Sequence, residues 1–148
     1  MPAARLLAAL GFPALATTSS GIAWSLGRQD NHVSLEDALA HIRAITHAVD
    51  IPVNADFEGG FATDPEGVAK NVTTALKTGI AGISIEDSTG DSARPLFDFA
   101  LSVERMRAAR LAVNASGTAA LLTSTLTGLG ATACTTAVIS AFVRMPGA

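Results

Sequence analysis

The sequence predicts an α/β fold built on a parallel β-sheet. Short apolar segments rich in β-branched residues alternate with amphipathic segments of helical period along residues 1–123. The ends of the apolar segments recur roughly every 30 to 36 residues, which is the spacing of repeated βαβ units. Hydroxyl or acidic residues follow these ends directly, and parallel α/β folds place their functional groups at that edge of the sheet.

The predicted helices and strands follow this alternation in order. Residues 1–18 are interpreted as a helix followed by a strand, and the strand PALATTSS (13–20) ends in hydroxyl side chains. Ser34 suits the N-cap of the next helix, because a short polar side chain there accepts a backbone N–H of the first turn. Asp64 suits another N-cap, and Gly79 suits the position just beyond the end of that helix. The remaining ranges are 34–50 (helix), 51–57 (strand), 64–79 (helix), 81–87 (strand), 95–113 (helix) and 119–125 (strand).

The composition limits the kinds of partner. The chain has 148 residues, of which 49% are hydrophobic and 16% charged, and its net charge is −3. This length allows one sizeable core. No cluster of Lys and Arg is present, so we expect no nucleic-acid partner. Cys134 is the single cysteine, which excludes an internal disulfide and a thiolate zinc site and fits a reducing, cytoplasmic location.

Two segments imitate membrane signals. Residues 1–18 resemble a signal peptide, but Gly11 and Pro13 interrupt their apolar run and the same residues fit a helix and a strand. Residues 111–143 carry no charge, but many Thr and Gly dilute their hydrophobicity, whereas a spanning helix needs about 20 strongly apolar residues. We therefore expect no membrane association. A secreted or membrane-tethered domain is the alternative.

Six acids follow or flank the predicted strand ends. Oxygen ligands that converge from several strands suit a hard cation such as Mg2+. A functional role is favoured for Asp56 and Glu86, because both follow apolar strand cores, where an unpaired carboxylate would be costly. A cap or loop role is favoured for Asp64, Asp91 and Asp98, because these positions prefer Asp. The six acids are Asp30, Asp56, Glu58, Glu86, Asp87 and Asp91.

Hydroxyl and aromatic residues lie near the first predicted strand end. The segment TTSSGIA (17–23) offers hydroxyls and backbone N–H groups to an anionic substrate group, although Ser-Gly also forms ordinary turns. Trp24 is interpreted as a packing residue that could wall a pocket. The histidines do not form a ligand set, because His41 and His47 lie six positions apart on one predicted helix and do not share a face.

Three segments in this order and spacing resemble the phosphoenolpyruvate mutase/isocitrate lyase superfamily: GFPALATTSSGIAWSLGRQD, IPVNADFEGGF and GISIEDSTGD. The similarity covers residues 3–123 and is to the mutase-like branch. It implies a TIM-type (β/α)8 barrel, of which the chain holds about four βα units, and dependence on Mg2+. It also implies that a C–C or P–C bond next to an α-oxo carboxylate is broken or formed. The expected substrate is a small oxo acid or phosphonate.

The resemblance also implies roles for individual residues. The family's Asp-x-Asp magnesium motif falls on Asn54-Ala55-Asp56, so Asn replaces its first Asp. The metal ligands expected here are Asp56, Glu86 and Asn54. The expected catalytic residues are Asp30, Asp56 and Glu86. The expected substrate-binding residues, to within one position, are Ser19, Ser20 and Gly21.

The chain departs from the family pattern in three ways. The loop DSTGDSAR replaces the Lys-Cys-Gly-His lid of the lyases that act on isocitrate and methylisocitrate, so those activities are not expected. No Arg occurs between Arg110 and Arg144, where the family has a substrate-binding Arg. A full barrel needs about 250 residues, and residues 124–148 lose the helix and strand alternation.

Two readings of the shortened chain follow. Residues 1–123 are interpreted as a partial barrel and residues 124–148 as an atypical tail, and our hypothesis is a truncated or frame-shifted gene. A half barrel exposes strand edges and apolar faces, so we expect a homo-oligomer. A catalytically inactive half barrel that self-associates is the alternative to an impaired enzyme.

Overall fold

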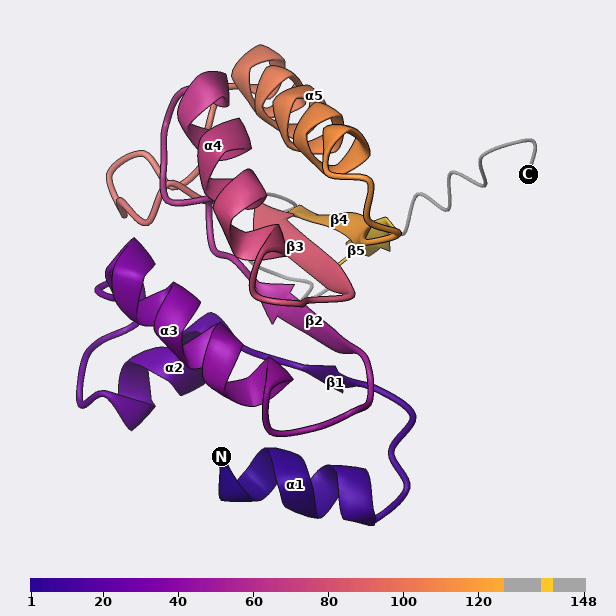
Figure 1. Ribbon diagram of the computed structural model, residues 1–148. Helices are drawn as coiled ribbons and strands as arrows, with labels where there is room; N and C mark the ends of the chain where they lie inside the picture. The colour runs from indigo at the N-terminus through magenta and orange to yellow at the C-terminus, as the bar shows by residue number, and fades with distance from the viewer. Residues whose placement is uncertain (127–136, 140–148) are drawn as a thin grey trace.

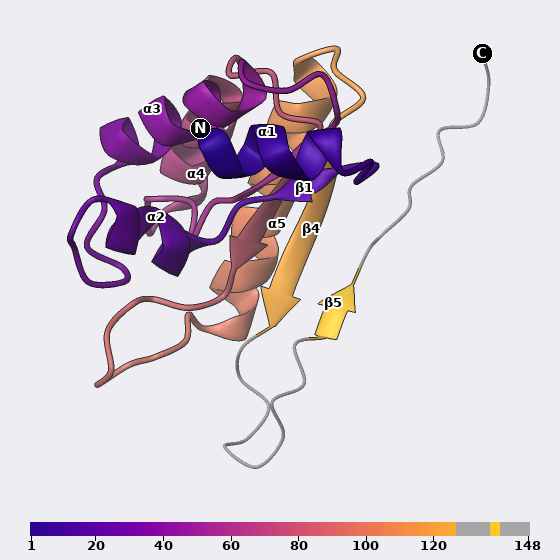
Figure 2. The ribbon, with the colours of Figure 1, turned by 90° about the horizontal axis from the view of Figure 1, so that it is seen from below.

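The computed structural model describes residues 1–126 and 137–139, which form a five-stranded sheet. The strands, in spatial order, are β1 (Leu15–Ala16), β2 (Val53–Asp56), β3 (Gly82–Glu86), β4 (Leu121–Leu126) and β5 (Ala137–Ile139). Strands β1 to β4 run parallel, which confirms the predicted parallel α/β fold. Strand β5 pairs with β4 antiparallel at the edge of the sheet (Figure 2). The rest of the tail predicted from residue 124 lies outside the described residues.

Of the five helices in the described residues, α1, α3, α4 and α5 lie where the sequence predicts them, and α2 was not predicted. Helices α3, α4 and α5 begin at capped positions, because the side chains of Ser34, Asp64 and Asp98 each accept a backbone N–H from the first turn. The Asp64 carboxylate lies 2.7 Å from the amide nitrogen of Gly67. The helices are α1 (Pro2–Ala9), α2 (Ser19–Ser25), α3 (Leu35–Thr46), α4 (Pro65–Leu76) and α5 (Phe99–Ala115).

The first strand is much shorter than predicted. The expected strand 13–20 reduces to β1, and Ser19 begins helix α2. The Thr17 hydroxyl accepts the backbone N–H of Asp56 at 2.9 Å, so a side chain continues the pairing beyond the strand. Short hydroxyl side chains favour such local bonds and helix starts over a continuing strand. The three hydroxyl residues that follow Thr17 therefore lead into a helix.

Alternation along the strands gives the sheet two different faces. On one face Ala55, Ile83 and Ile85 are fully or almost fully buried and form one core with α3, α4 and α5. Figure 1 shows α4 and α5 side by side over the sheet. The opposite face carries polar groups, where the Asn54 amide donates to the Ser84 hydroxyl at 2.8 Å. The Ser84 hydroxyl in turn lies 2.7 Å from that of Thr123.

Several large apolar side chains are exposed. Leu6 on α1 is 60% exposed, Leu10 at the C-cap of α1 is 66% exposed, and Leu121 on β4 is 50% exposed. Trp24 is 71% exposed, so its interpretation as a packing residue is wrong within this chain. Across residues 1–126 and 137–139, no helix has the length and apolar character needed to cross a bilayer.

The N-cap of α4 provides a test of how this helix is fixed. Asp64→Ala removes the acceptor for the Gly67 N–H, and we expect the free energy of unfolding to fall by about 1 kcal/mol. Asp64→Ser keeps a capping acceptor, and we expect it to stay within about 0.5 kcal/mol of the parent. Urea unfolding followed by circular dichroism measures both. An equal loss in the two variants would show that the cap is not what stabilises this helix end.

Candidate active site

Four acids come together at the carboxyl ends of β2 and β3. Asp56 is the last residue of β2 and Glu86 the last of β3, so parallel pairing places both at the same edge of the sheet. Glu58 follows β2, and Asp30 follows α2. The negative charges of Asp30, Asp56 and Glu86 contribute to the raised pKa of Glu58, so all three lie within electrostatic reach of it. The sequence-predicted residues Asp30, Asp56 and Glu86 therefore surround Glu58 at this end of the sheet.

The carboxylate of Asp56 is fixed by backbone donors. One oxygen accepts the N–H of Ser19 at 2.8 Å, and the other accepts the N–H of Glu58 at 3.2 Å. Asp56 also donates its own N–H to the hydroxyl of Thr17. These bonds join the start of α2, the end of β2 and the loop after β2 into one unit.

Among these four acids, Glu58 has the most strongly raised pKa. Burial raises its pKa to about 7, and the charges of Asp30, Asp56 and Glu86 add to the effect. Near neutral pH the side chain therefore exchanges a proton readily, as a general acid or base must. Glu58 lies in a left-handed conformation with φ 46°. The predicted catalytic and metal residues omit it, although it stands two positions after Asp56 and directly before Gly59-Gly60.

Glu86 shares this environment. Burial raises the pKa of Glu86, and the negative charges of Asp56, Asp30 and Asp87 raise it further. The backbone N–H of Glu86 donates to the carbonyl of Glu58 at 2.8 Å. This bond fixes the spacing between the two strand ends and so keeps the repelling acids together.

The other predicted site residues have different surroundings. Asn54 lies on the same face of β2 as Asp56, but its amide nitrogen is bound to Ser84. In the segment expected to bind substrate, the Ser19 N–H is bound to Asp56, and the Ser20 hydroxyl lies 3.1 Å from that of Thr18. Gly21 lies within α2. Ser19 thus orients the Asp56 carboxylate through its backbone N–H.

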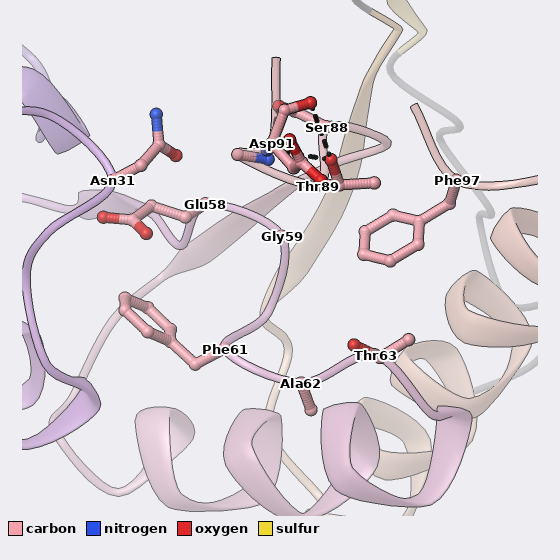
Figure 3. Close-up of a pocket in the computed structure, with 11 residues that line it drawn as sticks. Asn31, Glu58, Gly59, Phe61, Ala62, Thr63, Ser88, Thr89, Asp91 and Phe97 are labelled. Carbon is pink, nitrogen blue, oxygen red and sulfur yellow. Dashed lines mark hydrogen bonds between the residues drawn. The ribbon is translucent and has the colours of Figure 1, made fainter. Parts of the chain in front are cut away.

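A pocket of 430 Å³ opens beside the acids, between the loops that follow β2 and β3. Figure 3 shows Glu58 and Asn31 on one side of it, Ser88, Thr89 and Asp91 on another, and the Phe97 ring facing Gly59. Glu58 belongs both to this pocket and to the acid cluster. The pocket is lined by Asn31, Glu58, Gly59, Phe61, Ala62, Thr63, Ser88, Thr89, Gly90, Asp91 and Phe97.

Several of these lining residues carried no functional signal in the sequence. Asp91 was expected to be a loop residue and is one, because its carboxylate accepts the N–H of Ala93 at 2.8 Å. It also lines the pocket, as does Phe97, which lies before the start of α5. A better signal is their position, because the loops after neighbouring parallel strands meet over the same edge of the sheet.

The donor set suits Mg2+ in one respect and not in another. Burial and the neighbouring negative charges raise the pKa of Glu58 and of Glu86, and a divalent cation beside them would offset that repulsion. Within residues 1–126 and 137–139, however, no three His, Cys, Asp or Glu side chains are placed to hold a metal ion together. Mg2+ keeps several waters and needs only one or two carboxylates. The residues therefore fit a hydrated Mg2+ and do not form a closed cage.

Comparison with known proteins shows the family of this chain. The family model for phosphoenolpyruvate phosphomutase matches residues 1–127. The chain belongs to this family. The predicted membership of the phosphoenolpyruvate mutase/isocitrate lyase superfamily is thereby confirmed. Relatives in this superfamily are lyases and mutases, so the chain derives from an enzyme family.

Individual relatives match the chain over part of their length. The 2-methylisocitrate lyase of Escherichia coli (strain K12) is 38% identical over 82 residues, which make up 54% of this chain and 28% of that protein. A crystal structure from Burkholderia cenocepacia J2315, provisionally described as a lyase/mutase, is 43% identical with a TM-score of 0.80. That match covers 84% of this chain and 44% of the other.

A second crystal structure gives the fold. The 2,3-dimethylmalate lyase is 30% identical with a TM-score of 0.79, over 87% of this chain and 46% of the other. The chain spans less than half the length of these relatives. Its parallel strands and helices form part of a TIM-type barrel, as predicted.

The raised pKa of Glu58 predicts how stability depends on pH. The folded state binds a proton to Glu58 more tightly than the unfolded chain, so stability falls as pH rises from about 4.5 to about 7. Glu58→Gln removes this titration, and we expect it to be more stable than the parent above pH 7 by about 1 to 2 kcal/mol, allowing for partial solvent screening.

Urea unfolding at a series of pH values, without divalent cations, measures this difference. Asp50→Ala serves as a control, because Asp50 precedes β2 and lies at the opposite edge of the sheet. Parallel stability curves for the parent and Glu58→Gln would contradict the raised pKa.

Proposed function

We propose that this chain carries part of the active site of a Mg2+-dependent enzyme of the lyase or phosphonomutase type. Its reaction would break or form a C–C or P–C bond next to an α-oxo carboxylate. The observation that carries this proposal is the cluster of Asp30, Asp56, Glu58 and Glu86 at the strand ends. It is supported by the family match and by the lyases among the relatives.

The acids divide into groups that would hold the cation and groups that would move protons. Asp56 and Glu86 would hold Mg2+ directly or through waters, because each is the last residue of its strand and both lie at the same end of the sheet. The bond from Asn54 to Ser84 favours an indirect role for Asn54. When bound, Mg2+ supplies Lewis-acid stabilisation of the charge that develops on an oxo-acid oxygen. Glu58, with its pKa near 7, would exchange the proton.

The proposed substrate class, a small oxo acid or phosphonate, is the one that the family implies. The residues that line the described pocket include two carboxylates and no Lys or Arg. An oxo acid or phosphonate placed beside these acids needs a cation to offset the repulsion between like charges. The Ser20 hydroxyl, at an exposed position next to the Thr18 hydroxyl, would hold the anionic end of the substrate, together with the adjoining Ser19 and Gly21.

A second candidate function rests on the exposed apolar surface. Leu6 on α1, Leu10 at the C-cap of α1 and Leu121 on β4 are exposed. Exposed apolar surface of this kind favours pairing with another copy. An inactive half barrel that self-associates is therefore the alternative. Homo-oligomerisation, a cytoplasmic location and the lack of a nucleic-acid partner stay predictions.

Binding of Mg2+ tests the enzyme proposal. A ligand that binds only the folded state stabilises it by about 2.7 kcal/mol at a concentration one hundred times its dissociation constant. We therefore expect millimolar Mg2+ to raise the Tm of the parent chain. Asp56→Ala should abolish the shift and Asp50→Ala should retain it, because Asp50 lies away from the strand ends. A parent chain whose Tm does not respond to Mg2+ would sink the metal assignment.

Self-association can be tested on α1. Replacing both Leu6 and Leu10 by Glu puts charge on the exposed face of the helix, and we expect the variant to lose mass relative to the parent in analytical ultracentrifugation. Lys70→Glu, at an exposed position on α4, controls for added negative charge. A parent that sediments as a monomer at every concentration would contradict the second candidate.

A further inference from the structure

The loop after β2 adopts an unusual backbone conformation. Glu58, Gly60 and Phe61 have φ values of 46°, 76° and 54°. Glycine adopts such angles freely, but Glu and Phe do so rarely. Residues held in sparsely populated conformations persist only where their surroundings fix them. The loop that carries Glu58 into the site therefore needs contacts that hold it.

Two side chains from the helices supply these contacts. The guanidinium of Arg105 on α5 donates to the carbonyls of Gly59 and Ala62, the latter at 3.1 Å. The amide of Asn71 on α4 donates to the carbonyls of Gly60 and Phe61 at 3.0 and 3.1 Å. All four successive carbonyls from 59 to 62 are thus bound by Asn71 or Arg105.

Arg105 also contacts the opposite side of the pocket. Its guanidinium carbon lies 3.6 Å from the centre of the Phe97 ring. Phe97 belongs to the loop after β3 and is tied back to it, because its N–H donates to the carbonyl of Asp87 at 2.9 Å. Gly59, Ala62 and Phe97 all line the pocket (Figure 3). One guanidinium therefore joins two loops that are separate in sequence.

This arrangement is costly for a residue that only fills the core. Arg105 is 2% exposed, and burial lowers its pKa. Its Nε has no hydrogen-bond partner among the described residues. Positions 105, 109 and 113 form the buried stripe of α5, and the other two carry Ala and Val. An apolar side chain would suit this stripe, so the arginine is explained by its bonds to the loops.

We propose that Arg105 is a positioning residue for the candidate active site. It holds the loop 57–62, which places Glu58, in a fixed relation to the loop 87–98, which places Phe97. The planar guanidinium is needed, because it donates to two carbonyls and stacks on the ring at the same time. The effect of this relation on Mg2+ binding rests on the proposed function, whereas the relation between the loops does not.

Amide chemical shifts of the 15N-labelled full chain test the inference directly. In Arg105→Met we expect shifts at Gly59 to Ala62 and also at Ser88 to Phe97. Asn71→Leu removes only contacts to the first loop, so we expect it to shift the first set and leave the second unchanged. Arg107→Met, at an exposed position on the same helix, should shift neither set.

A second measurement separates positioning from stability. At a temperature where each variant is fully folded, we expect Arg105→Met and Arg105→Lys to bind Mg2+ about tenfold more weakly than the parent, and Arg107→Met to bind as the parent does. Lysine does not rescue the site, because its ammonium cannot donate to both carbonyls and stack. If Arg105→Met fails to fold, Arg105→Lys takes its place in both measurements.

The outcomes distinguish the two proposals. Arg105 variants that leave the amide shifts of residues 88–97 unchanged would overturn the inference. So would Arg105 variants that bind Mg2+ as tightly as a parent chain that binds the ion. A parent chain that binds no Mg2+ would defeat the proposed function alone. In that case the amide shifts still decide whether Arg105 couples the two loops.

Discussion

The hydrogen bonds of the Asp56 carboxylate fix the backbone at the carboxyl end of β2, where the candidate site lies. Its two oxygens accept N–H groups from the start of α2 and from the loop after β2. These bonds set where Ser19 begins its helix and where Glu58 leaves its strand. A residue expected to bind metal is thus also a structural acceptor. Charge-assisted bonds of this kind are among the stronger ones in proteins, so the acid is held in place before any ligand arrives.

The apolar core beneath the acids offsets the free-energy cost of holding several carboxylates close together. Alternation along β2 and β3 sends Ala55, Ile83 and Ile85 into the core and leaves Asp56 and Glu86 facing the other way. The same strands therefore supply both apolar burial and the charged edge. Burial raises the pKa of Glu58, and the neighbouring negative charges raise it further, so keeping this carboxylate charged at the edge of the core costs free energy.

Much of this arrangement follows from local sequence. The caps at Ser34, Asp64 and Asp98, the strand cores and the acids at strand ends were all predictable, because each depends on a few neighbouring residues. The start of α2 at Ser19 was missed, since a hydroxyl run fits a strand end as well as a helix start.

Other features depend on parts of the chain that meet only in the fold. Burial raises the pKa of Glu58, and the charges of Asp30 and Glu86, which come from other segments, add to the effect. The role of Arg105 depends on carbonyls more than forty positions away in sequence. The sequence predicted a packing role for Trp24, which its exposure contradicts, because the apolar character of a side chain does not specify what covers it.

The polar line from Asn54 through Ser84 to Thr123 has a consequence for how this sheet meets solvent. In a closed barrel this face would be the interior, which is usually filled by bulky branched side chains. Here amide and hydroxyl groups run across three neighbouring strands. Because they hydrogen-bond to one another, this polar line stays paired whether or not another layer covers it.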